Sequence, residues 1–186
     1  MDTALHQTLE RVRAAIADSS PLRIRGGGSK DFHALQLQGD ILDTRSLHGI
    51  VSYEPSELVV TVRAGTPLAE REAALAAQGQ CLAFEPPHYA TAEGDVATVG
   101  GMVAAGWSGP ARASVGAVRD FVLGIEIING QAELLRFGGT VMKNVAGYDV
   151  SRLMAGSWGT LGLITEVSLK VLPVAPGEAT LRFEGI

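Results

Sequence analysis

The sequence predicts an α+β fold in which short strands and short helices alternate without an internal repeat. Three observations predict it. Apolar residues follow helical spacing near the N-terminus, they form short β-branched or alternating stretches elsewhere, and 23 glycines divide the chain into discrete turns. Hydrophobic residues make up 46% of the 186 residues. A chain of this length and composition buries a core of its own without disulfides or metal ions.

The first half of the chain is predicted to contain two helices and five strands. Leucine, valine and isoleucine at helical spacing predict a helix over residues 3–17. Thr66 and Pro67 are expected to begin a second helix, as N-cap and first-turn proline, which ends near Gly79. Strands are expected at residues 22–25, 40–43, 48–53, 58–62 and 81–84.

The second half is predicted to contain two short helices and longer strands. The stretch ATVGGMVAAGWSG, residues 97–109, is small and apolar, which favours a tightly packed helix framed by glycines. Residues 147–154 are predicted to form another helix, and Asn129-Gly130 is typical of a two-residue hairpin turn. Strands are expected at residues 121–128, 132–137 and 163–171, with one more beginning at 180–183.

These elements are expected to form two strand-rich lobes, residues 1 to about 86 and about 90 to 175. No linker-like composition separates the lobes, so we expect them to pack closely. Together they would form one domain over residues 1–176. Residues 177–186 would then be a tail or the start of a further C-terminal domain.

Charge and cysteine content exclude several classes of protein. The net charge is −5 without a block of like charges, which argues against nucleic acid and anionic membranes as partners. Cys81 is the only cysteine, so no internal disulfide forms and a cytoplasmic setting is expected. No stretch reaches the roughly 18 apolar residues of a spanning helix. The four histidines have no metal-ligand spacing, and no catalytic residue is recognisable.

The stretch IRGGGSK, residues 24–30, is the first candidate binding site. Consecutive amides at Gly26, Gly27 and Gly28 can converge on a phosphate, Ser29 can add a hydrogen bond, and Lys30 supplies positive charge. The stretch alone leaves an ordinary tight turn equally open. The spacings of the Walker A loop and of the dinucleotide fingerprint are both absent.

Two further glycine-rich segments, residues 97–120 and 156–165, could bring backbone close to a flat ligand. Close helix packing is the alternative for part of the first segment, and a β-bulge or a turn into a strand is the alternative for the second. The candidate binding residues in these segments are Thr98, Gly100, Gly101, Ser108, Gly109, Gly116, Arg119, Asp120, Gly159, Thr160, Gly162 and Ile164.

Together the three segments resemble the FAD-binding domain of the vanillyl-alcohol oxidase/p-cresol methylhydroxylase flavoprotein family. An R-G-G-G-S loop at residues 25–29 is followed by T-x-G-G at 98–101, by G-x-x-R-D at 116–120 and by G-S-x-G-x-L-G-x-I-T at 156–165, in the order of the family. The resemblance covers about residues 20–173. It implies a two-lobed FAD-binding domain of the p-cresol methylhydroxylase type, with FAD held by glycine-rich loops.

Within that family, residues 137–162, and VMKNVAGYD in particular, resemble the FAD-binding subunits of bacterial glycolate oxidase complexes. The resemblance implies oxidation of glycolate or D-lactate, small 2-hydroxy acids. It also implies two partners, a related flavin-containing catalytic subunit and an iron–sulfur subunit, and a membrane association through these partners. The alternative is a non-catalytic structural subunit that supports a related flavoprotein.

The chain departs from the family at two points. Some members attach FAD through a histidine where this chain has Ser29 or through a cysteine near the second segment, and Cys81 lies too early for that position. The resemblance therefore implies non-covalent FAD. The resemblance also implies a cap domain that covers the flavin, which would follow residue 186 in a longer protein or be dispensed with in this version, so we expect the isolated 186-residue chain to be nearly inactive. Valine at Gly27 or Gly100 is expected to remove FAD without unfolding the protein.

Overall fold

The computed structural model describes residues 2–33, 38–90, 96–141 and 147–185, and its centre is a five-stranded antiparallel sheet. The strands lie in the order β3-β4-β8-β6-β7. Their bounds are Ile50–Glu54 for β3, Val59–Arg63 for β4, Leu163–Lys170 for β8, Val122–Ile128 for β6 and Leu134–Gly138 for β7. Two smaller sheets join β1 (Leu22–Arg25) to β2 (Asp40–Asp43) in parallel, and β5 (Gln80–Cys81) to β9 (Leu172–Pro173).

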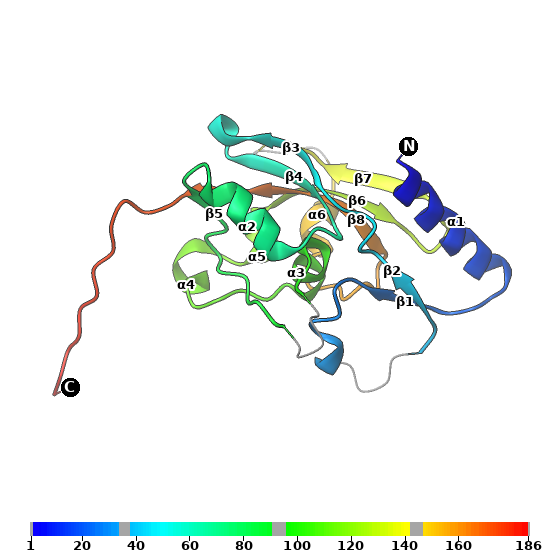
Figure 1. Cartoon of the computed structure of the whole chain (residues 1–186), viewed down its shortest axis with the longest axis horizontal. Coiled ribbons are helices and arrows are strands. Elements are labelled where there is room, and N and C mark those ends of the chain that lie inside the picture. Colours follow the sequence, from blue (N-terminus) through cyan, green and yellow to red (C-terminus); the bar gives the residue numbers. More distant parts are fainter. Residues whose placement is uncertain (1, 34–37, 91–95, 142–146, 186) are drawn as a thin grey trace.

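One face of the sheet is covered by short helices (Figure 1). They are α2 (Leu68–Ala76), α3 (Val99–Ala105), α5 (Val118–Phe121) and α6 (Val150–Leu153), and α4 (Arg112–Val115) lies farther out. Alternate strand residues point to this face because side chains in a strand alternate sides, and they form the main core with the helices. None of the helices in the described ranges has the length and apolar character needed to cross a bilayer.

The N-terminal helix α1 (Thr3–Ala17) packs beside the ends of the central strands (Figure 1). Asp2 caps it, because its carboxylate accepts a hydrogen bond from the Ala4 amide at 2.9 Å. Its apolar stripe forms a second core with β2 and with the facing ends of β6 and β8. The helix therefore connects the β1-β2 pair to the central sheet.

The central sheet takes strands from both sides of the lobe boundary expected near residues 86–90. β4 pairs with β8, with Val62 opposite Val167, and β8 pairs in turn with β6. The boundary therefore does not separate two sheets. The α+β class and the helix over residues 3–17 are confirmed, as are the strands at 22–25 and 40–43. Helices α4 and α5 were not predicted, since four-residue helices carry too little periodicity to be recognised.

Three local predictions are wrong. The hairpin at Asn129-Gly130 is a longer loop, because the Asn129 side chain accepts hydrogen bonds from the amides of Gln131 and Glu133 and the next strand begins at Leu134. The second helix begins at Leu68 with Pro67 at the N-cap. The Thr66 hydroxyl instead accepts from the Gly49 amide.

The third wrong prediction concerns the C-terminal segment. Residues 180–183 form no strand: they are exposed, and the part of the chain that the structure describes offers them no partner strand. A β-strand is held by backbone hydrogen bonds to a neighbouring strand, whereas exposed extended residues can satisfy these groups with water. Two other elements are shorter than predicted. The strand expected at 81–84 is Gln80–Cys81, and the helix expected at 147–154 is Val150–Leu153.

Arg71, on α2, is the most unusual residue of the core. Its side chain is fully buried, and none of its three guanidinium nitrogens donates a hydrogen bond to a described residue. Its nearest compensation is the ring of Tyr53, whose centroid lies 5.4 Å from Cζ. Burial lowers the pKa of Arg71 to about 10, so the charged form is disfavoured by its surroundings.

We therefore expect Arg71→Met to raise the free energy of unfolding by about 1–3 kcal/mol, since it removes buried donors without partners and keeps an apolar stem. Urea denaturation measures this change. Arg71→Lys, which keeps a buried charge, is the control and is expected to give no stabilisation. A less stable methionine variant would contradict this account of the guanidinium.

Candidate functional site

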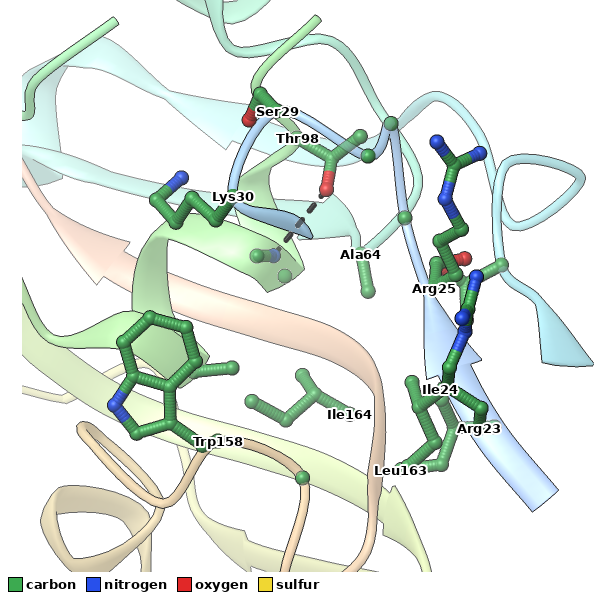
Figure 2. Close-up of a pocket in the computed structure, with 18 of the residues that line it drawn as sticks. Arg23, Ile24, Arg25, Ser29, Lys30, Ala64, Thr98, Trp158, Leu163 and Ile164 are labelled. Carbon is green, nitrogen blue, oxygen red and sulfur yellow. Dashed lines mark hydrogen bonds between the residues drawn. The ribbon is translucent and has the colours of Figure 1, made fainter. Parts of the chain in front are cut away.

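A cavity of about 180 Å³ lies where the loop after β1, the start of α3 and the turn before β8 meet (Figure 2). Three segments that are far apart in sequence thus form its walls. Its lining consists of Arg23, Ile24, Arg25, Gly26, Gly27, Gly28, Ser29, Lys30, Asp31, Thr44, Ala64, Thr98, Gly100, Gly101, Ala104, Trp158, Gly159, Gly162, Leu163 and Ile164.

The glycines of this site are required by the protein's own backbone packing. A Cβ on Gly27 would lie 1.8 Å from the Val96 carbonyl oxygen, and one on Gly100 would lie 2.7 Å from the Cβ of Ala64. Neither position has room for a side chain of any kind. The expectation that valine at Gly27 or Gly100 would act on FAD alone is therefore corrected, because the substitution would also displace backbone.

Thr98 connects the glycine loop to α3. It is the N-cap of the helix, and its Oγ1 accepts a hydrogen bond from the Gly101 amide at 3.2 Å. On its other side, a Cβ on Gly26 would lie 2.6 Å from the same oxygen. The hydroxyl therefore caps the helix and fills the space against the loop, where position 26 has no room for a side chain.

The cavity is positively charged although the chain as a whole is negative. Arg23, Arg25 and Lys30 line it together with one carboxylate, that of Asp31, which accepts a hydrogen bond from Arg25 Nε at 2.6 Å. The Nε of Arg23 is buried and has no hydrogen-bond partner among the described residues. A buried donor of this kind is costly unless a bound group pairs with it. The site is suited to an anion such as a pyrophosphate.

The third wall is a strained turn that is held by α3. The amides of Gly156 and Trp158 donate to the carbonyl oxygens of Val103 and Ala104, at 3.1 and 2.9 Å. Trp158 has a φ of 53°, in the left-handed region that bulky residues rarely adopt. Its indole lies at the edge of the cavity, below Lys30 in Figure 2.

Eleven of the seventeen predicted binding residues line the cavity. They are Gly26, Gly27, Gly28, Ser29, Lys30, Thr98, Gly100, Gly101, Gly159, Gly162 and Ile164. The prediction had placed them in three separate segments, and the fold brings these together. Thr160 lies instead in a neighbouring depression beside α1.

The other five predicted residues belong to the segment 108–120, outside the cavity lining. Ser108 Oγ accepts from the Val118 amide, and the Asp120 carboxylate accepts from the Ala117 amide, so both stabilise the start of α5. Gly109 is packed against Glu85, and Gly116 ends α4 at a φ of 100°. Arg119 is exposed. The contacts of these residues hold the segment together.

Sequence reasoning missed several lining residues. Thr44, Ala64 and Ala104 carry no signal of their own, because each lines the cavity only through the packing of distant segments. Arg23 and Trp158 had a signal: each is a large side chain inside or beside a glycine-rich motif. Among the described residues, no cluster of three or more His, Cys, Asp or Glu side chains is placed to hold a metal ion.

Fold and cavity together define a domain that binds an extended anionic ligand between glycine-rich loops. The chain matches a family model described as an FAD-binding domain over residues 5–138. The chain belongs to this family of FAD-binding domains. The cationic cavity with its glycine loop fits the pyrophosphate of FAD, which would lie against the Gly26–Gly28 loop with Arg23 and Lys30 beside it.

The relatives include subunits of glycolate oxidases and a D-lactate dehydrogenase. The chain is 56% identical over 176 residues to the glycolate oxidase subunit GlcE of Escherichia coli (strain K12), which covers 95% of this chain and 49% of that protein. It is 32% identical over 143 residues to the glycolate oxidase subunit GlcD of Bacillus subtilis (strain 168), which covers 77% of this chain and 29% of that protein. It is 35% identical over 135 residues to a D-lactate dehydrogenase of Anaerostipes hadrus, which covers 73% of this chain and 27% of that protein.

A solved structure of alkyldihydroxyacetonephosphate synthase has the same fold. It superposes with a TM-score of 0.73 at 24% identity, covering 92% of this chain and 31% of that one. The chain therefore spans about half the length of its GlcE relative and less than a third of the other three proteins.

Lys30 gives FAD binding a predicted pH dependence. Burial lowers the pKa of Lys30 below its ordinary value of 10.5, and the pyrophosphate would favour the charged form and raise that pKa again in the complex. FAD affinity is therefore expected to be full while Lys30 is protonated in the free protein and to fall as pH rises through its lowered pKa. Fluorescence titrations from neutral to alkaline pH measure this.

Lys30→Met is expected to bind FAD about tenfold more weakly than wild type at neutral pH. Its FAD affinity is expected not to fall as the pH rises. The other titratable side chains that line the cavity are Asp31 and two arginines, and Tyr89 lies under the Lys30 ammonium; all of them are unchanged in Lys30→Met, so the difference between the two proteins reports the lysine. Lys170→Met, outside the cavity lining, is the control. An identical pH profile in Lys30→Met would contradict the assignment.

Proposed function

We propose that this chain is the FAD-holding part of a flavin-dependent oxidoreductase complex that acts on glycolate or a similar small 2-hydroxy acid. The observation that carries the proposal is the positively charged, glycine-walled cavity in a chain that is 56% identical to a glycolate oxidase subunit. The similarity to a D-lactate dehydrogenase supports the same substrate class.

The chain's own residues would bind and orient the cofactor. FAD, when bound, supplies the two-electron chemistry that converts a hydroxyl group to a carbonyl. The backbone at Gly26, Gly27 and Gly28 gives the pyrophosphate close access, and Arg23 and Lys30 balance its charge. We assign no proton-abstracting residue in this chain. A partner would supply the groups that clamp the substrate carboxylate and accept its proton.

The proposed partners are a second flavin-containing subunit and an iron–sulfur subunit. The similarity to both a GlcE and a GlcD subunit supports the first, because two related flavin subunits then occur under one enzyme name. The iron–sulfur partner is an inference from the need to carry electrons onward from flavin one at a time. The complex is proposed to reach the membrane through these partners.

The FAD is proposed to be held without a covalent bond. Ser29, which follows the glycine triplet, is a poor attachment point for the flavin, and Cys81 lies in β5, outside the cavity lining. Precipitation of the FAD-loaded protein with acid is expected to release all of the flavin into the supernatant. The Cys81→Ser variant, denatured with acid in the same way, serves as the control. Yellow colour that stays in the wild-type pellet would overturn this proposal.

The FAD-loaded chain alone is expected to be reduced slowly by glycolate, and reduction is expected to accelerate sharply with the partner subunits. The reason is that the cavity opens without a wall of catalytic side chains, so the substrate would be neither clamped nor shielded from water. Anaerobic bleaching near 450 nm, a general flavin absorbance, measures it. Full-speed reduction by the chain alone would contradict the partner's role. No bleaching even in the complex would favour the structural-subunit alternative.

A further inference from the structure

Strand β8 contains one extra residue where it passes behind the cavity. Glu126 on β6 lies opposite Glu166 on β8. The next β6 residue, Ile127, lies opposite Ile164, so Thr165 is left without a residue opposite it on β6. An extra residue of this kind is a β-bulge. Bulges are frequent next to binding sites, where they change the direction in which a side chain points.

The bulge decides which side chain of β8 reaches the cavity. Ile164 and Val167 are three positions apart, yet both belong to the main core on the helix-covered face of the sheet. Side chains alternate along a regular strand, so two residues at this spacing would point to opposite faces. The extra residue at position 165 removes this conflict, and Ile164 lines the cavity as a result.

The bulged residue is anchored by a buried carboxylate. Thr165 is fully buried, and its hydroxyl donates a hydrogen bond to Glu126 Oε1 at 2.8 Å. Glu126 is only 2% exposed, and a buried carboxylate is costly unless it is paired. Arg136 Nε donates to its other oxygen at 2.6 Å, and the Arg63 guanidinium lies 3.7 Å from Oε1. The hydroxyl of Thr165 is therefore held by a charge-assisted hydrogen bond.

The backbone of Thr165 continues this contact toward the cavity. Its carbonyl oxygen accepts a hydrogen bond from the Ala64 amide at 2.9 Å, and the Ala64 carbonyl accepts from the Gly100 amide at 2.7 Å. Ala64 and Ile164, both labelled in Figure 2, line the cavity. A continuous path of contacts thus runs from Glu126 through Thr165 and Ala64 to the start of α3. We call this path the relay.

The relay begins on the opposite face of the sheet from the helices. Glu126 stands between Ile125 and Ile127, which both point into the main core, so its own side chain points to the other face. Neither Glu126 nor Thr165 lines the cavity. Any effect of this pair on a bound cofactor must therefore pass through Ala64 and Ile164.

We propose that Glu126 and Thr165 are positioning residues for the FAD site. Their buried hydrogen bond keeps the bulge in β8, and the bulge holds Ala64 and Ile164 in the cavity wall. The inference rests on FAD binding by the chain, and it adds two residues that act from behind the wall. It is independent of which 2-hydroxy acid is oxidised.

The test removes the hydroxyl of Thr165 and measures FAD affinity by fluorescence titration. Thr165→Val keeps the branched shape and is expected to bind FAD about tenfold more weakly than wild type. Thr165→Ser keeps the hydroxyl and is expected to stay within about twofold of wild type. Glu126→Gln keeps an oxygen that accepts from Thr165 and is expected to stay within about threefold. Thr165→Ala carries the same expectation as the valine variant should that variant not fold.

Thr61→Val is the matched control. Thr61 and Ser168 form another buried hydroxyl pair between strands of the same sheet, 2.8 Å apart, and neither residue lines the cavity. This variant is expected to lower the melting temperature about as much as Thr165→Val and to leave FAD affinity unchanged. Equal losses of affinity in the two variants would reduce the role of Thr165 to general stability and overturn the inference. Wild-type affinity in Thr165→Val would overturn it as well.

A second measurement needs no FAD. In the free protein, the amides of Ala64 and Gly100 are expected to exchange hydrogen about tenfold faster in Thr165→Val than in wild type, and at the wild-type rate in Thr61→Val. Unchanged exchange in Thr165→Val would contradict the relay. Absence of FAD binding by the wild-type chain would instead contradict the proposed function, and the exchange rates would still decide whether the bulge holds the cavity wall.

Discussion

The site depends on one close approach between backbone segments. Residues 96–100 run between the segment 64–68 and the glycine loop after β1, and they bond directly to the former: the Gly100 amide donates to the Ala64 carbonyl at 2.7 Å, and the Leu68 amide donates to Ala97. On the other side, Gly28 forms a bridge with Val96. These direct backbone contacts hold the loop, α3 and the end of β4 together around the cavity.

Charge then selects what this rigid cavity can hold. The chain carries a net charge of −5, yet three of the four charged side chains that line the cavity are cationic. The low dielectric inside the cavity strengthens each contact between these cations and a bound anion. Arg25 is held by Asp31, so its charge is fixed in place. Arg23 and Lys30 remain for the pyrophosphate.

The sequence alone predicts which segments line the cavity, but it does not predict how these segments contact one another. The glycine loop, Thr98 and the turn at 156–165 have local signals, because phosphate loops and N-caps have characteristic residues. Two features could not be predicted from the sequence. Strands β4 and β8 are a hundred residues apart, so their pairing, and with it the joining of the two expected lobes, depends on the whole core. The segment 108–120 carries a binding motif, yet its polar groups pair with one another.

The short helix α3 sets the distance between the glycine loop after β1 and the turn before β8. Its start, at Gly100, lies against Ala64 beside the phosphate loop, and its end, at Gly106, lies against Gly156 in the turn that carries Trp158. Six residues of helix span about 9 Å. Each end requires glycine because backbone meets backbone there, and the Ala104 carbonyl between them accepts the Trp158 amide. A longer helix, or one with larger residues at either end, would move Trp158 away from Lys30. The run of small residues in VGGMVAAG thus acts as a spacer that fixes the distance between the glycine loop after β1 and the turn before β8.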